Sequence, residues 1–166
     1  MATKLDIEQL CAEMATFMRS KLNTRLLALD SEKNDGITLK PVTSTGEPDG
    51  FFFQDLGDRI ANFDPFVLYG IDSVRVQPGQ NIGPATAKTY TIHVIVVIQD
   101  NGNDPSLTKR LLRYQRALWE IFEVDWATVR HGAKFKIGGL MPIAFELLNR
   151  SQPDRAVGIS LEVTLA

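Results

Sequence analysis

The stretch Thr89–Gln99, TYTIHVIVVIQ, constrains the fold of this chain more than any other part of its sequence. Alternate residues from Tyr90 to Ile98 are all apolar, and the opposite face is apolar at its centre, at Ile95 and Val97. Side chains of a strand point alternately to opposite faces, so a strand apolar on both faces is typical of a sheet covered on both sides. We therefore expect helices to cover one face. Another subunit is a candidate cover for the other face.

Residues 6–29 are predicted to form an amphipathic helix, because apolar residues recur there at three- and four-residue steps. Asp6 is the predicted N-cap, since its carboxylate can accept hydrogen bonds from unpaired backbone N–H groups. Cys11 lies within the apolar stripe and is the single cysteine of the chain. We interpret it as a small buried hydrophobic residue. Because it cannot form an intramolecular disulfide, we expect a reducing compartment.

A second helix is predicted from Pro105 to about Val124, after the polar turn NGND. Asp104 is its predicted N-cap, and proline at the first position loses no hydrogen bond. Its apolar stripe consists of Leu107, Leu111, Tyr114, Leu118 and Ile121. The opposite face carries the basic residues Lys109, Arg113 and Arg116. Such a face is most often solvated, and the alternatives are a subunit contact or a contact with DNA phosphates.

Three further extended segments are predicted. Residues 66–77 form a strand with a bulge or sharp bend at Gly70, and residues 133–148 form one or two strands broken at glycines and a proline. Residues 156–166 alternate between apolar and small or polar residues, and the turn before them indicates a hairpin. Because the chain stops on a strand, the edge of that strand is a candidate for strand addition by a partner.

The order α-β-β-α-β-β predicts an α+β fold of two layers, an antiparallel sheet with two main helices packed on one face. We expect residues 1–166 to form a single domain with a long loop at about 30–65. Within that loop, residues 36–42 are a candidate short strand. The three phenylalanines at 51–53 are predicted to join the core, and an exposed aromatic patch is the alternative.

Composition excludes several functions. The net charge of -2 argues against a general nucleic-acid-binding protein, and the longest unbroken apolar run, VIVVI, is far too short to cross a membrane. His93 lies among apolar residues and is interpreted as a hydrogen-bonded structural histidine. No ligand spacing typical of a zinc or calcium site is present in the sequence. We therefore predict no catalytic residue, no cofactor and no metal site, and a soluble, cytoplasmic protein.

The segments FDPFVLYGIDSVRVQ, TYTIHVIVVIQD, LLRYQRALWEIFE and GISLEVTLA together resemble the tail-terminator and tail-completion (neck) proteins of tailed bacteriophages. The resemblance lies in element order and covers about residues 5–29 and 64–166. It implies a ring, commonly a hexamer, at the head-proximal end of the tail tube. Such a ring ends tube polymerisation and joins the tail to the head connector. In contractile tails it also meets the sheath protein, and genomic DNA passes through its lumen.

The resemblance therefore implies a structural protein of the virion neck that is assembled in the host cytoplasm. Our candidate residues for subunit or partner contacts are Gln77, Gln80, Asn81, Lys109, Arg113, Arg116, Glu162 and Thr164. An alternative is a small oligomeric α+β module that binds a ligand without catalysis, with Arg130 and His131 as candidate polar groups. A third alternative is an enzyme whose site the sequence does not reveal.

Overall fold

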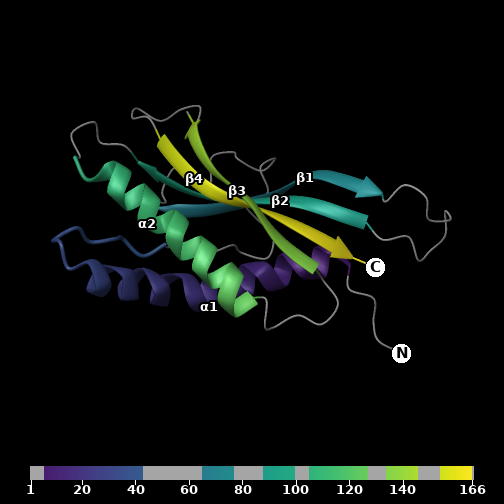
Figure 1. Cartoon of the computed structure of the whole chain (residues 1–166), viewed down its shortest axis with the longest axis horizontal. Coiled ribbons are helices and arrows are strands. Elements are labelled where there is room, and N and C mark those ends of the chain that lie inside the picture. Colours follow the sequence, from purple (N-terminus) through teal and green to yellow (C-terminus); the bar gives the residue numbers. More distant parts are fainter. Residues whose placement is uncertain are drawn as a thin grey trace.

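A computed structural model gives the structure of the chain and describes residues 6–42, 65–76, 88–99, 105–126, 134–145 and 154–165. In chain order the elements are α1 (Ile7–Lys33), β1 (Phe66–Val76), β2 (Lys88–Gln99), α2 (Leu107–Glu120), the π-helix η3 (Ile121–Trp126), β3 (Lys134–Phe145) and β4 (Asp154–Leu165). The four strands form one antiparallel sheet in the order β1-β2-β4-β3. Helices α1 and α2 lie on one face of it (Figure 1), so the predicted α+β fold is confirmed.

Helix α1 begins as predicted, because the Asp6 carboxylate accepts a hydrogen bond from the Gln9 N–H at 2.7 Å. It ends at Lys33, beyond the predicted end at residue 29. Asn34 adopts a left-handed conformation with φ 42° and donates its N–H to the carbonyl of Asp30, which terminates the helix. The periodicity of apolar residues does not indicate the end of α1 at Lys33, because the last turn lies largely in solvent and needs no apolar residue.

After α1 the chain turns back over the helix without forming a strand, so the predicted short strand at 36–42 is wrong. The Asn23 side chain bonds both the N–H and the carbonyl of Val42, at 2.8 and 3.0 Å. The Tyr114 hydroxyl donates to the carbonyl of Lys40 at 2.8 Å. Side chains of the helices thus satisfy backbone groups that a paired strand would satisfy in a sheet. The phenylalanines at 51–53 lie outside the described residues.

Strand β2 lies inside the sheet and is buried on both faces, as its sequence predicts. Its even-numbered residues face the helices and enter the main core: Ile92, Val94, Val96 and Ile98. On the opposite face Ile95 and Val97 are also buried, together with Ala156 of β4. Because these residues are already buried within one chain, a second subunit is not needed to cover them.

Strand β1 contains a bulge, but not at the predicted position. Gly70 pairs regularly with His93, and the register shifts between Ile71 and Ser73, so Asp72 is the additional residue. The bulge moves the alternation of side chains by one position. Ile71 pairs with Ile92 before it and Val74 pairs with Tyr90 after it. Both therefore lie on the face that carries the helices.

The second helix starts later than predicted. Pro105 lies in the preceding turn, α2 begins at Leu107, and its N-cap residue Ser106 makes no side-chain capping bond. Asp104, the predicted cap, lies outside the described residues. Beyond Glu120 the chain continues as the π-helix η3 to Trp126, past the predicted end at Val124.

The aromatic rings of η3 pack against α1. Trp126 and Phe122 lie with their ring centroids 4.8 and 5.7 Å from that of Phe17. Both contacts are tilted or edge-to-face, the arrangement that the ring quadrupoles favour. These ring contacts hold the end of the second helical segment against the first helix.

Strand β4 is not available for strand addition, so the prediction that the end of the chain offers an edge is wrong. Thr164 is paired with Thr89 of β2 on one side and with Lys134 of β3 on the other. Strand β3 folds back outside β4 and becomes the edge, as one continuous strand with a register shift between Gly138 and Leu140. A proline within this strand, Pro142, is tolerated because an edge strand has one unpaired side.

Candidate functional site

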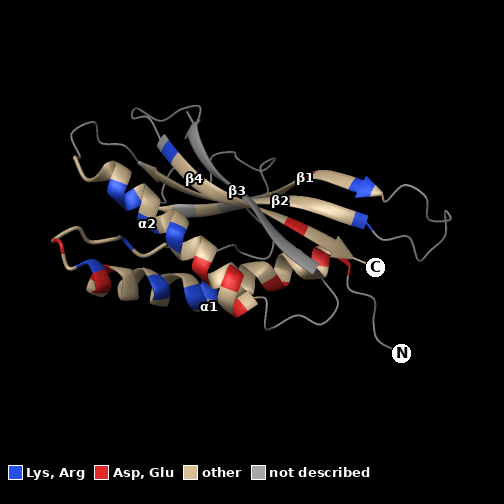
Figure 2. Cartoon of the chain, in the orientation of Figure 1, with Lys and Arg blue, Asp and Glu red and all other residues tan. Residues whose placement is uncertain are grey.

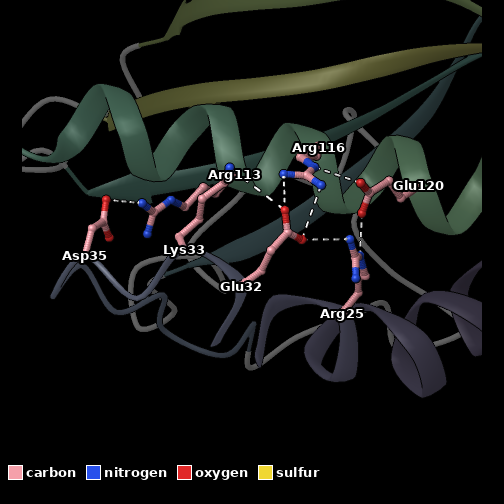
Figure 3. A network of polar contacts seen from close by, with 7 residues as sticks. All are labelled: Arg25, Glu32, Lys33, Asp35, Arg113, Arg116 and Glu120. Atoms are coloured by element: carbon pink, nitrogen blue, oxygen red, sulfur yellow. Dashed lines mark hydrogen bonds and ion pairs between the residues drawn. The ribbon is translucent and has the colours of Figure 1, made fainter. Parts of the chain in front are cut away.

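The polar residues between α1 and α2 form a closed network of ion pairs (Figure 3). The Arg116 guanidinium lies 3.0 Å from the Glu32 carboxylate and 2.7 Å from that of Glu120. Arg25 pairs with the other oxygen of Glu120 and lies 3.6 Å from Glu32. Burial alone would raise the pKa of Glu120, but the hydrogen bonds from Arg25 and Arg116 outweigh it and lower this pKa. The Arg116 guanidinium therefore forms its ion pairs within the subunit, whereas we predicted it to face solvent or a partner.

Arg113 is buried, which corrects its prediction as part of a solvated basic face. Its guanidinium donates to the Asp35 carboxylate at 2.5 Å and to the carbonyl of Ile37 at 3.1 Å. The hydrogen bond from Arg113 lowers the pKa of Asp35, against a smaller opposing effect of burial. The backbone after α1 thus supplies the partners of this arginine (Figure 3). Helical periodicity could not predict them, because they come from residues about 80 positions away along the chain.

We expect the stability of the chain to fall in acid, because the pKa values of Asp35 and Glu120 are lowered in the folded state. A carboxyl group whose pKa is lower in the folded state than in the unfolded chain stabilises the fold. That contribution is fully present above the ordinary carboxyl pKa, which is about 4. That stability is lost as the pH falls through the lowered values. Urea unfolding at constant ionic strength should show this decline, and Glu120→Gln should make it shallower. Glu123→Gln, at an exposed glutamate in the following turn, is the control. Equal slopes in both variants would contradict the assignment.

The other predicted contact residues are only partly brought together. Lys109 is exposed on α2. Glu162 and Thr164 are half-buried on the helix-free face of β4, where the Thr164 hydroxyl lies 2.9 Å from that of Thr89. Gln77, Gln80 and Asn81 lie outside the described residues, and so do the alternative ligand groups Arg130 and His131. The five of these eight residues that the structure describes therefore do not form one surface.

A row of polar side chains, Asp72, His93 and Ser160, crosses three strands of the helix-free face. The Ser160 hydroxyl lies 2.7 Å from Nδ1 of His93, and Nε2 lies 3.8 Å from the Asp72 carboxylate. These are the residue types of a nucleophilic triad. However, 3.8 Å is too long for the hydrogen bond that would orient the imidazole. The geometry favours the predicted structural histidine, and its hydrogen bond to Ser160 is confirmed.

Cys11 is buried against the core, as predicted, and burial raises the pKa of its thiol to about 11. At pH 8 this leaves about 200-fold less thiolate than an ordinary cysteine has. We expect iodoacetamide to alkylate the native protein far more slowly than the urea-unfolded protein. Intact-mass spectrometry over time measures both rates. Rapid alkylation of the native chain would contradict the burial of this thiol.

An apolar corner of the sheet remains uncovered. Ile71, Val74 and Val76 all lie on the helix-bearing face of β1, and they are 37%, 51% and 59% exposed. Strand β1 is an edge strand, and the helices do not cover this end of it. We call these three residues the β1 corner. Their common face could not be read from the sequence, because strict alternation places Ile71 with Ser73 and Arg75.

A second exposed apolar pair lies on α2. Leu112 is 58% exposed and Trp119 is 38% exposed. They are seven positions apart, which places them on one face of the helix, outside the buried stripe. We call them the α2 stripe. Figure 2 shows that α2 is basic over its first turns and acidic towards its end. Their seven-residue spacing is the sequence signal that indicates a common face.

Comparisons with known proteins give this chain no family. A scan against protein-family models found no match, and a search of curated proteins found no similar sequence. None of the described helices combines the length and apolar character needed to cross a membrane. Within the same residues, no group of three or more His, Cys, Asp or Glu side chains comes together as metal ligands do.

Proposed function

We propose that this protein is a structural component of a tailed-bacteriophage virion, a ring at the head-proximal end of the tail tube. The ring, a hexamer in the proteins that the sequence resembles, ends polymerisation of the tail-tube protein and joins the tail to the head connector. It meets the sheath protein if the tail contracts, and genomic DNA passes through its lumen. The protein acts through its shape and its surfaces, without a cofactor.

The observation that carries this proposal is the β1 corner. Three neighbouring apolar side chains, Ile71, Val74 and Val76, are exposed on one edge strand. Single exposed apolar residues are ordinary on a soluble protein, but a cluster on one surface is typical of a site that another protein covers. This favours a protein that assembles with others.

The arrangement of the charged residues also supports a role in assembly. The ion pairs of Arg25, Glu32, Arg116 and Glu120 join α1 to α2 within the subunit. They hold the two helices together behind the sheet (Figure 3). A rigid two-layer subunit suits a component whose function is to present fixed surfaces to neighbouring rings.

Two measurements on one preparation test the proposal. Light scattering over a range of concentrations gives the native mass, and electron microscopy gives the length of tail tubes assembled with and without the protein. We expect a mass six times that of the 18.5 kDa chain, either in solution or on the tube. We also expect tubes to stop growing when the protein is added. Tubes of unchanged length would contradict the proposal, and a stable dimer or trimer would favour the ligand-binding alternative.

A further inference from the structure

The α2 stripe is flanked by a base at one end and an acid at the other. Lys109 precedes Leu112 by three positions, and Glu123 follows Trp119 by four. Such spacings set side chains beside each other on a helix surface. All four residues are exposed, and Figure 2 shows the change from basic to acidic along α2. The outward face of the second helical segment thus carries a base, two apolar side chains and an acid, in that order.

The two flanking charges have no ion-pair partner in the part of the chain that the structure describes. Lys109 attracts the Asp35 carboxylate only as the weakest of several influences on it, and Glu123 makes no printed polar contact. By contrast, Arg116 and Glu120 of the same helix pair with each other at 2.7 Å. Lys109 and Glu123 are therefore available to opposite charges on a partner.

The face is complementary to itself when two copies run antiparallel. Residue 116 is midway between Lys109 and Glu123, and the midpoint of Leu112 and Trp119 lies half a residue away, about 0.75 Å along the axis. A two-fold axis at this point sets Lys109 of each copy opposite Glu123 of the other, as a self-complementary contact requires. In the same register Leu112 of each copy lies opposite Trp119 of the other. A parallel arrangement would instead set like charges against each other.

Arg116 lies at the axis, where two copies of the same side chain would meet. Two bare guanidinium groups there would oppose the contact. However, each Arg116 is held by Glu32 at 3.0 Å and by Glu120 at 2.7 Å. Each copy therefore brings its own carboxylates to the axis, and the ion pairs between α1 and α2 remove most of this repulsion.

We propose that two copies of this chain associate through α2, packed antiparallel about a two-fold axis at Arg116. This inference goes beyond the proposed ring and does not rest on it. Subunits of one ring all point the same way around it, so a two-fold contact joins two free copies or copies in two facing rings.

The contact is small, because only Leu112 and Trp119 supply its apolar area. We expect a dissociation constant on the order of 100 µM, as for weak and transient contacts. Such a dimer separates on dilution, which distinguishes it from the stable dimer of the ligand-binding alternative.

Charge-reversal variants test the antiparallel register. Lys109→Glu sets a carboxylate against Glu123 twice in each dimer, and Glu123→Lys sets an ammonium group against Lys109 twice. In sedimentation equilibrium at low ionic strength, each variant alone should associate at least about tenfold more weakly than the native chain. An equimolar mixture of the two should recover the native affinity, because each mixed dimer contains two acid–base pairs.

Lys21→Glu is the matched control, because it makes the same chemical change at an exposed lysine of α1. It should associate as the native chain does. A mixture that binds no more tightly than the separate variants would overturn the contact, and so would an equal loss in Lys21→Glu. A native chain that shows no association at about 1 mM would also overturn it. If the native chain is already a hexamer, the same contact joins two hexamers, and the larger species should respond to the variants in the same way.

A second pair of variants tests the apolar part of the contact. Trp119→Ala removes a ring that the dimer uses twice, and it should weaken association at least about thirtyfold in dissociation constant. Leu27→Ala is its control, because Leu27 is 68% exposed on α1 and lies outside the α2 stripe. Circular dichroism and thermal unfolding of each variant confirm that the subunit is folded. Equal affinities of the two variants would overturn the proposed contact.

Discussion

Replacing Gly158 with alanine is expected to destabilise the fold by about 3 kcal/mol or more, the upper range for overpacking a core. A Cβ atom at this position would lie 2.3 Å from the carbonyl oxygen of Val94 and 3.0 Å from Cα of Ile95. Both atoms belong to the backbone of β2, which is paired on each side in the middle of the sheet. They cannot withdraw without breaking the ladder of hydrogen bonds.

The carbonyl of Gly158 adds to this effect. It accepts a hydrogen bond from the buried Gln115 side chain at 3.0 Å, which ties α2 to the sheet. A displaced β4 would lose that bond and leave buried polar groups unpaired. Gly158→Ala should therefore also loosen the position of α2.

Urea unfolding measures the loss at Gly158, and Gly36→Ala is the matched control. No heavy atom lies within 4 Å of the added Cβ at Gly36, although its φ of +79° disfavours a side chain. We expect that control to cost about 1 kcal/mol from backbone strain alone. Similar losses at the two glycines would contradict the close approach of β4 to β2.

Replacing Trp126 with alanine is expected to cost about 3–5 kcal/mol, the range for removing a buried aromatic side chain. Trp126 is 1% exposed, and its ring packs on Phe17 and Phe122 at centroid distances of 4.8 and 6.0 Å. This cluster joins η3 to α1, so the variant should loosen the end of the second helical segment first. Amide hydrogen exchange would then increase in η3 before it increases in the sheet.

Trp119→Ala is the control for this variant, because it makes the same chemical change at the exposed tryptophan. We expect it to change the stability of the isolated subunit by less than about 1 kcal/mol, as surface substitutions do. Unfolding is measured at a protein concentration where subunits do not associate. If the two variants lost the same stability, the assignment of Trp126 to the core and of Trp119 to the surface would be wrong.

The two tryptophans together separate a core position from a surface position. Trp126→Ala should lower the stability of the subunit, whereas Trp119→Ala should leave that stability nearly unchanged. Both tryptophans lie within a single helical run, and only their orientation distinguishes them.

Much of the fold follows from local patterns. The N-cap at Asp6 was found from its residue type, because the capping bond joins residues three apart. Strand β2 could be predicted because its alternating apolar residues and its run of β-branched residues both indicate a strand inside a sheet. The class of the fold then followed from the order of its elements.

The candidate site could be predicted from the sequence much less well than the fold. Arg113 was predicted on a solvated face, yet it is buried and donates hydrogen bonds to Asp35 and to the carbonyl of Ile37. Arg116 was predicted as a contact residue, yet it pairs with Glu32 and Glu120. In both cases the partners come wholly or partly from distant segments. Periodicity places a residue on a face, but it does not say what lies opposite.

The sequence by itself determined the order of the main helices and strands and the apolar stripes of α1, α2 and β2, because propensity and periodicity act over a few neighbouring residues. The tertiary structure alone decided the strand order, which places β4 inside the sheet and β1 at its edge. It also decided the bulge at Asp72 that gathers Ile71, Val74 and Val76 on one face. These features depend on pairing between segments far apart in the chain, and the free energy of such pairing is not encoded in any one of them.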